Sequence, residues 1–325
     1  MYGDEPSPYM LPLKSPGGRP LFFTVNFMIH SNKALTLVNP QNGNLAFKIF
    51  PFTDGDQFDH LQRLNYYSLI LLIEGSSIVR ADFSEYAVKS NTLLCFSPYQ
   101  PFMMREENKL NGIAVNFHPD FFCIHKHHHE VACNGVLFNN IYEPPFVILT
   151  EEEKDGFISL TEKMKSEMQN DHVAQYELLV SYLKIFLINA SRIKIGQRPD
   201  IQNDLHPASE PFILQRLKEA IEQNYRTKHS AGDYADLLHV STNTLAKVSK
   251  SYFNKTLTDL ISERIVIEAK RELYLTSKSV KQIAYELGFS DEYYFSRFFK
   301  INTDISPSLY RTTVGFAKGS ESPNA

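Results

Sequence analysis

Cysteines and long apolar runs are both scarce in this sequence. Its 325 residues include only three cysteines, Cys95, Cys123 and Cys133, and an odd, sparse set favours a reducing compartment over a disulfide scaffold. The longest apolar run, residues 66–73, is far shorter than the roughly 18–20 residues of a membrane-spanning helix. Residues 1–20 lack a basic start followed by an apolar stretch, so we expect no secretory signal. These absences predict a cytoplasmic protein without a membrane partner.

The composition is that of a folded, globular chain, with 43% hydrophobic and 22% charged residues. The length allows two domains, each with its own core. The net charge of −4 is unevenly distributed. Residues 211–325 hold 16 Lys and Arg against 13 Asp and Glu, whereas residues 1–210 hold 17 against 24. If the protein binds nucleic acid, the C-terminal part is therefore expected to face the phosphates.

The pattern of the first half is that of a β domain. Residues 1–20 are rich in Pro and Gly and are expected to form a flexible arm. From about residue 21 to 149, short apolar runs alternate with turn residues, which predicts a sandwich or small barrel. Strands are expected at 66–73, 77–83, 92–96 and 110–117, with Glu74-Gly75-Ser76 as a tight turn between the first two.

Two helices are expected to follow the strands. Thr150 and Glu153 have the spacing of a capping box, and a second helix is expected over residues 174–192. Its apolar stripe indicates either a homodimer seam or a face packed on the barrel. The Pro-containing segment 196–210 is expected to be the interdomain linker. The stripe consists of Leu178, Leu179, Tyr182, Leu183, Phe186 and Leu187.

Residues 230–252 have the layout of a helix-turn-helix. Ser230 and Ser241 are candidate N-caps for two short helices, with His239-Val240 as the turn between them. In the first helix Tyr234, Leu237 and Leu238 are the expected apolar contacts, and in the second Leu245, Val248 and Tyr252 should face the core. The opposite side of the second helix is small, polar and basic, which suits insertion into a DNA major groove. Its candidate DNA-binding residues are Thr242, Asn243, Ala246, Lys247 and Lys250.

A second helix-turn-helix is expected over residues 279–302. Gly288 permits a sharp turn, and Asp291 or Ser290 is positioned to cap the next helix. Phe295, Phe298 and Phe299 should point inward. The residues expected to face outward, as candidate DNA contacts, are Glu292, Tyr293, Ser296, Arg297 and Lys300. Glu292 is the weakest of these, because a carboxylate is repelled by phosphates and could only read a cytosine amino group.

A helical period over residues 256–275 joins the two units. Twenty helical residues span about 30 Å, and successive major-groove faces of B-DNA lie about 34 Å apart. A rod of this length would place two recognition helices into adjacent groove segments on one side of a duplex. The apolar positions that keep the period are Leu257, Leu260, Ile261, Ile265, Ala269 and Leu273.

Over residues 212–311 the sequence resembles the AraC/XylS family of transcription regulators. The matching strings are Ile283-Ala284-Tyr285-Glu286-Leu287-Gly288-Phe289-Ser290-Asp291, Tyr293-Tyr294-Phe295-Ser296-Arg297-Phe298-Phe299-Lys300 and Ser306-Pro307-Ser308-Leu309-Tyr310-Arg311, with Arg264, Ala269 and Leu273 in the linker helix. The resemblance implies double-stranded DNA as a partner, contact of both outward faces with bases and phosphates, and RNA polymerase as a further partner.

The sequence departs from the family pattern mainly in and after the first unit. Ser249 stands where a phenylalanine is usual, so that helix is expected to pack less tightly. Asn254 and Asp304 stand where glycine commonly ends a recognition helix, and both tolerate the left-handed conformation. Lys247 replaces an arginine and lacks its bidentate fork, whereas Arg297 keeps it.

The N-terminal half resembles, more weakly, the cupin-like effector or dimerisation domain found in such regulators. The carriers are Gly75, the 91–96 strand with Ser97-Pro98, and residues 112–117 before His118-Pro119. The expected fold is α+β and multidomain: an arm (1–20), a cupin-like β-barrel with two following helices (21–195), a linker (196–210), an all-α DNA-binding domain (211–313) and a tail (314–325). A small-molecule effector is expected in the barrel, but no contact residue can be assigned.

Other functions fit the sequence less well. A metal site at Cys123, His125, His127, His128, His129 and Cys133 is disfavoured, because consecutive histidines cannot all face one ion and a spaced His-x-His signature is missing. We expect no metal and no cofactor. A cupin-type enzyme with a helical appendage would need a spaced His/carboxylate set or a nucleophile motif, so no enzyme activity is expected. A third alternative is an adaptor that binds protein through the helical domain.

Overall fold

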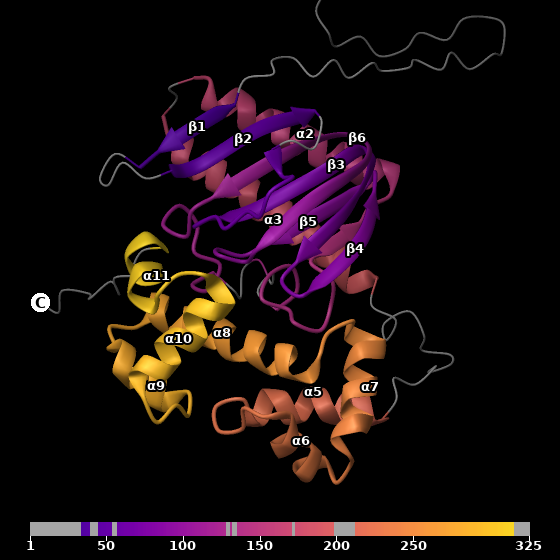
Figure 1. Cartoon of the computed structure of the whole chain (residues 1–325). Coiled ribbons are helices and arrows are strands. Elements are labelled where there is room, and N and C mark those ends of the chain that lie inside the picture. The colour runs from indigo at the N-terminus through magenta and orange to yellow at the C-terminus, as the bar shows by residue number, and fades with distance from the viewer. Residues whose placement is uncertain are drawn as a thin grey trace, which may run out of the picture. The chain divides into compact units, whose positions relative to one another are not determined.

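The computed structural model describes residues 34–39, 45–53, 57–127, 131, 135–170, 173–197 and 212–314 (Figure 1). Within these ranges the chain forms an antiparallel β-sheet, then two long helices, then a set of shorter helices around one central helix. This order confirms the expected α+β fold. The expected arm, residues 198–210 of the expected linker and residues 315–325 of the tail lie outside the described residues. No helix in the described ranges is long and apolar enough to cross a membrane.

In the part of the chain that the structure describes, seven strands form a single antiparallel sheet whose hydrogen-bonded order is β1-β2-β6-β3-β5-β7, with β4 paired to β3. Among the residues that the structure describes, β1 and β7 end this path and no pairing joins them, so closure into a cupin-like barrel stays a prediction. The strands are β1 (Leu35–Val38), β2 (Leu45–Thr53), β3 (Tyr67–Ala81), β4 (Ser84–Lys89), β5 (Thr92–Phe96), β6 (Phe102–Phe117) and β7 (Phe146–Ile148).

The tight turn predicted at Glu74-Gly75-Ser76 is wrong, because β3 runs continuously through it. Gly75 has a φ of +91° at a series of register shifts between β3 and β6. A β-carbon built there would lie 2.1 Å from the carbonyl oxygen of Lys109. The glycine therefore forms part of a bulge that bends one long strand, and the hairpin reverses instead at Asp82, which has a φ of 50°.

In the central strands both faces of the sheet are apolar. Successive side chains of a strand point to opposite faces, and each face packs in its own hydrophobic cluster. Leu69 and Leu71 of β3 pack in a cluster with the two long helices, whereas Ile70 and Leu72 pack in a second cluster on the other face. In that second cluster the rings of Phe96 and Phe102 stack with their centroids 3.9 Å apart. Bulky side chains thus fill the space inside the bend of the sheet.

Helices α2 (Glu151–Met168) and α3 (Gln175–Gly196) cover the first of these faces. The predicted capping box is confirmed, since the Thr150 side chain accepts from the Glu153 backbone N–H and the Glu153 carboxylate accepts from the Thr150 N–H. The apolar stripe of α3 packs on the sheet and on α2. Of the two interpretations of this stripe, a homodimer seam or a face packed on the β domain, the structure shows the second. Its buried members are Leu179, Leu183, Phe186 and Leu187, while Leu178 is exposed.

The helical part contains α5 (Phe212–Asn224), α6 (Ala231–Leu238), α7 (Thr242–Phe253), α8 (Leu257–Leu275), α9 (Val280–Glu286), α10 (Glu292–Thr303) and α11 (Pro307–Val314). Helix α8 is the predicted linker helix, and a capping box between Thr256 and Asp259 begins it. In Figure 1, α6 and α7 lie toward one end of α8 and α9, α10 and α11 lie toward the other.

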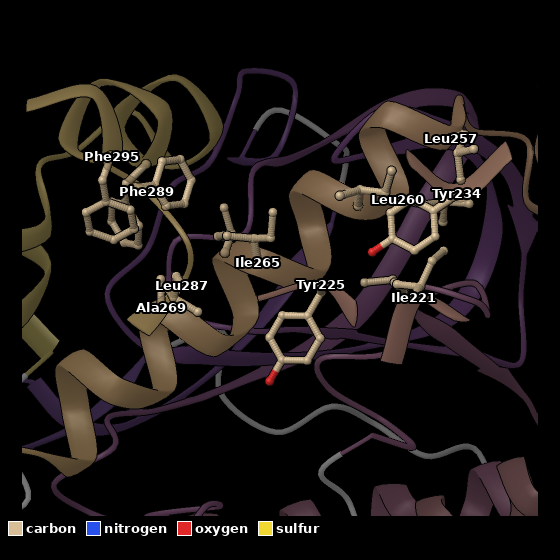
Figure 2. Close-up of a cluster of buried hydrophobic side chains, with 14 of the residues drawn as sticks. Ile221, Tyr225, Tyr234, Leu257, Leu260, Ile265, Ala269, Leu287, Phe289 and Phe295 are labelled. Atoms are coloured by element: carbon tan, nitrogen blue, oxygen red, sulfur yellow. The ribbon is translucent and has the colours of Figure 1, made fainter. Parts of the chain in front are cut away.

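One hydrophobic core runs along α8 and joins both helix pairs. Figure 2 shows Leu257 and Leu260 beside Ile221 of α5 and Tyr234 of α6. Phe289, in the turn before α10, and Phe295 of α10 lie nearer Ile265 and Ala269. All of these side chains are buried. Because the two ends of α8 pack against different helix pairs, the rod is fixed to both by burial rather than by chain connection alone.

Candidate nucleic-acid interface

The first helix-turn-helix is built by three local signals. Ser230 caps α6 and forms a capping box with Asp233, as its spacing predicts. His239 ends α6 in the left-handed conformation, with a φ of 55°, and turns the chain toward α7. Ser241 then caps α7 by accepting from the backbone N–H of Thr244. These caps satisfy the first N–H groups of two short helices that would be marginal alone.

The second unit repeats the design with different residues. Ser279 caps α9 through a capping box with Gln282. Gly288 makes the turn with a φ of +79°, and Asp291, rather than Ser290, caps α10 by accepting from the N–H groups of Tyr293 and Tyr294. Asn254 and Asp304 end the two recognition helices in the left-handed conformation, which confirms that they can replace glycine.

The ten candidate DNA-binding residues lie on α7 and α10, the second helix of each unit. On α7, Thr242, Asn243, Ala246, Lys247 and Lys250 are all exposed. On α10, Tyr293, Arg297 and Lys300 are exposed, while Glu292 and Ser296 are partly buried. The fold thus places these residues, five on each helix, on two recognition helices that share the rod α8.

The inner faces of the recognition helices differ from expectation at two positions. Tyr252 is 52% exposed, and the neighbouring Phe253 fills the core position instead. The prediction that Tyr252 faces the core is therefore wrong, because the stripe 245–249–253 points inward rather than 245–248–252. Phe298 is only partly buried, while Phe295 and Phe299 are fully buried. In the first helix of unit one, Leu237 is 37% exposed, whereas Tyr234 and Leu238 are buried.

Ser249 is fully buried, and its hydroxyl oxygen has no hydrogen-bond partner among the described residues. It occupies the position on α7 that Phe299 occupies on α10, fifty residues later. The core of the first unit therefore contains a small polar side chain where the second unit has an aromatic ring. Looser packing of α7 stays a prediction.

A network of charges ties α8 to α5, and sequence reasoning did not find it. Arg264 donates from Nε to Glu222 Oε2 at 2.8 Å, and its guanidinium lies 3.9 Å from the centroid of the Tyr225 ring. Glu268 accepts from Arg226 Nη2 at 2.7 Å. Burial by itself raises the Glu268 pKa, but the nearby Arg271, Arg264 and Arg226 lower it overall, so the carboxylate stays ionised.

The loop that leads into the first helix-turn-helix unit contacts the second unit directly. A β-carbon built at Gly288 would lie 2.1 Å from the carbonyl oxygen of Arg226 and 3.3 Å from Nε2 of His229. The His229 ring contacts Phe289 with centroids 4.7 Å apart, and burial lowers the pKa of His229, which favours its neutral form. The loop before α6 therefore packs against the turn before α10, in addition to the connection through α8.

The histidines and cysteines that the sequence disfavours as a metal site lie partly outside the described residues, since His128, His129 and Cys133 are not described. Where the structure does describe the chain, no group of three His, Cys, Asp or Glu residues is arranged to hold a metal ion. The His127 ring instead stacks on Phe122 at 4.8 Å, and its Nδ1 lies 2.9 Å from the carbonyl oxygen of Cys123. Both contacts pack the His127 ring against neighbouring residues of the same segment.

A family model described as a helix-turn-helix domain matches residues 234–313. The regulator YfiF of Bacillus subtilis, described as an uncharacterized HTH-type transcriptional regulator, is 22% identical over 257 residues, which cover 78% of each chain. RafR of Pediococcus pentosaceus, a raffinose operon transcriptional regulatory protein, is 27% identical over 140 residues, which cover 43% of this chain and 46% of RafR.

Among solved structures, that of an apo ToxT variant from Vibrio cholerae aligns with 83% of this chain and 98% of that chain, at 15% identity and a TM-score of 0.38. The matched helix-turn-helix domain contains the end of α6, both recognition helices and the rod between them. Together with this geometry, the matches identify the chain as a helix-turn-helix transcription regulator, with its helix-turn-helix domain over residues 234–313.

Proposed function

We propose that α7 and α10 enter successive major-groove segments on one side of a duplex and read its sequence there. The observation that carries this proposal is the packing of both recognition units onto one rod through a continuous core. Helix α8 has 19 residues and is therefore about 28 Å long, while one turn of B-DNA repeats after about 34 Å. The proposal requires the offset of the recognition helices from the ends of α8 to supply the remaining distance.

Different residues of the two helices would supply the affinity for DNA and the base specificity. Lys250 and Lys300 neutralise phosphates and supply affinity that does not depend on sequence, whereas Lys247 contributes to base readout. Arg297 carries a planar guanidinium that matches the O6 and N7 atoms of guanine, and we assign the strongest base readout to it. Asn243 and Ser296 add base-specific hydrogen bonds. Thr242, Ala246 and Tyr293 line the groove walls, and Glu292 would read a cytosine amino group.

The domain assignment that goes with this function is a sensing or dimerising β domain over residues 21–195, a linker over 196–210 and the DNA-binding domain over 211–313. We propose that the first of these responds to a small-molecule effector, that the chain works in the cytoplasm without enzyme activity, and that it contacts RNA polymerase. For a homodimer through helix 174–192, the exposed side chains Leu178 and Ile185 on α3 would form the seam, since the buried stripe is occupied.

A mobility-shift titration on genomic fragments at two salt concentrations tests the DNA-binding proposal. A DNA-binding protein that neutralises several phosphates loses affinity for DNA steeply as the salt concentration rises. An adaptor that binds protein shows no such salt dependence in this assay. Sequencing the captured fragments would give the operator. Failure to retain any fragment at 50 mM salt would contradict the proposal. Sedimentation at micromolar concentration, with and without DNA, tests the dimer.

A further inference from the structure

A small cavity lined by both polar and apolar side chains lies where the β-sheet, the rod α8 and the last turn of α10 meet within residues 33–325. The volume open to the centres of water-sized molecules is about 60 Å³. Its walls include Asp82 from the β3–β4 turn, Glu263 and Lys270 from α8, and Asn302 from α10. The Nζ atom of Lys270 donates to the carbonyl oxygen of Pro98 at 2.9 Å, which ties α8 to the β domain at this point. None of these residues belongs to the DNA-binding face described above.

Glu263 gives the cavity a buried carboxylate with one oxygen available. Its side chain is 10% exposed, and its Oε2 pairs with Lys255 Nζ at 2.7 Å. Its other oxygen, Oε1, is buried and has no hydrogen-bond partner in the part of the chain that the structure describes. Burial raises the pKa of Glu263 above its usual range, with Lys255 acting in the opposite direction. An acceptor buried without a partner is costly, about 1–3 kcal/mol, unless a bound molecule satisfies it.

Two further groups face the same space with opposite charge. Asp82 Oδ2 accepts from Gln100 Nε2 at 2.6 Å, and burial raises the Asp82 pKa while Lys255, Gln100 and Lys270 oppose that rise. Burial lowers the pKa of Lys270 to about 8, and the Asp82 charge acts against this change. The cavity therefore offers both a hydrogen-bond acceptor at Glu263 and a donor at Lys270.

Size and charge narrow the class of molecule that fits. A water molecule needs roughly 10–15 Å³ of such volume, so 60 Å³ corresponds to about four to six non-hydrogen atoms. The ionisable groups of the lining are Asp82, Glu143, Lys194, Glu263 and Lys270. Their formal charges nearly cancel, so a charged ligand would add a charge that the site does not compensate. Hydroxyl groups both donate and accept, and they suit a site that presents both functions.

We propose that this cavity is the binding site of a small, neutral, polyhydroxylated molecule of about three carbons, held by Glu263 Oε1 as acceptor and Lys270 Nζ as donor. The ligand would contact the β domain, the rod and α10 at once. This inference rests on the proposed response to a small-molecule effector, and it places the site at α8 rather than inside the bend of the sheet.

The position of the site also explains how ligand binding in the cavity would affect the two recognition helices. Lys255, the partner of Glu263, directly follows Asn254, which ends recognition helix α7. Lys255 Nζ also lies 3.4 Å from the carbonyl oxygen of Ile141 in the β domain. On the other side Asn302 belongs to recognition helix α10. A ligand that bridges Asp82, Glu263 and Asn302 would thus favour one arrangement of both recognition helices relative to the β domain.

Saturation-transfer NMR on the full-length protein tests the site, with glycerol and dihydroxyacetone as neutral probes and acetate and methylammonium as charged ones. We expect saturable transfer to the neutral probes only, and at least tenfold weaker binding in Lys270→Met and in Glu263→Gln. Lys163→Met, at an exposed position of α2, is the matched control and should bind as the wild type does. Circular dichroism of each variant establishes that it is folded.

Unchanged glycerol binding in both folded cavity variants would overturn the proposal, and so would a preference for either charged probe. Absence of saturable binding of both neutral probes to the wild type would overturn it as well. Mobility shifts on the same preparations separate this result from the proposed function. DNA binding without polyol binding would support the proposed function and contradict the proposed ligand site. Polyol binding without DNA binding would support the ligand site and contradict the proposed function.

Discussion

Gly288 lies directly against the backbone of Arg226, so that a β-carbon at residue 288 would meet the Arg226 carbonyl oxygen at 2.1 Å. Arg226 lies in the loop before α6 and Gly288 in the turn before α10, and 61 residues separate them in the chain. The contact limits how far the units can rotate about α8. It therefore acts on the relative position of the two recognition helices as well as on the local turn.

Gly288→Ala should destabilise the helical domain for two reasons. The φ of +79° is unfavourable for alanine, and the new methyl group would clash with rigid backbone rather than with a flexible side chain. We expect a loss of about 2–4 kcal/mol, measured as a lower midpoint of urea unfolding.

Gly232→Ala is the matched control. Gly232 lies within α6, and its added β-carbon would meet only Ser230 Oγ at 3.6 Å, which is an ordinary contact. Alanine in a helix is favoured over glycine by roughly 0.5–1 kcal/mol, so this variant should be slightly more stable than the wild type. Equal effects of the two substitutions would show that the contact with Arg226 contributes nothing.

Ser249→Ala should leave stability unchanged or raise it by about 1 kcal/mol, because it removes a buried hydroxyl that has no partner in the described part of the chain. Thr303→Val, on the second recognition helix, should do the opposite. The Thr303 hydroxyl contacts the carbonyl oxygens of Phe299 at 2.8 Å and Ile305 at 3.1 Å, and its loss should cost about 1–2 kcal/mol. Thermal unfolding of the two variants checks the contrast, and destabilisation by Ser249→Ala would mean that the hydroxyl is satisfied in solution.

Lys270→Met should change how stability depends on pH. In the unfolded chain the Lys270 amine titrates near its ordinary value of 10.5, whereas burial lowers its pKa in the folded protein to about 8. As the pH falls from 10.5 toward 8, the unfolded chain takes up the proton first, so the wild type loses stability over this window. The variant lacks this loss and should exceed the wild type by up to about 3 kcal/mol more at pH 7.5 than at pH 10.5.

The measurement is urea unfolding of both proteins at matched pH values, taken as a difference so that other titrating groups cancel. Lys163→Met, on an exposed face of α2, supplies the control and should follow the wild type at each pH. A difference that does not vary between pH 7.5 and 10.5 would show that the Lys270 amine is solvated in the folded protein.

The sequence was most informative where a single local signal decides the structure. Caps at Ser230 and Ser241 and the left-handed ends at Asn254 and Asp304 were all predicted, because each depends on a few neighbouring residues. Periodicity likewise placed α8 and the two recognition helices.

Features that depend on distant partners were not predictable in the same way. The Gly75 segment resembles a hairpin turn locally, and only its approach to Lys109 on β6 makes it a bulge. Exposure of Tyr252 rather than Phe253 depends on a small rotation of α7 that periodicity does not determine. The pairing of Lys255 with Glu263 joins residues eight apart across a helix start, so no short motif marks it.

Arg297→Ala should weaken binding to the cognate operator by about 1–3 kcal/mol and relax specificity at one base position. Arg297 is exposed on α10, and its guanidinium can donate two parallel hydrogen bonds to guanine. Arg297→Lys should keep most of the salt dependence but lose the discrimination, because lysine retains the charge without the fork. Competition binding against operators substituted at each position measures both quantities.

Arg192→Ala serves as the control for charge, since Arg192 is exposed on α3 outside the helix-turn-helix domain. It should bind as the wild type does. An Arg297→Ala isotherm that matches the wild type at every operator would remove base readout from α10. An equal loss at all operators, with a salt slope reduced by about one, would instead assign Arg297 to a phosphate. Sequence reading would then rest on Asn243, Lys247 and Ser296.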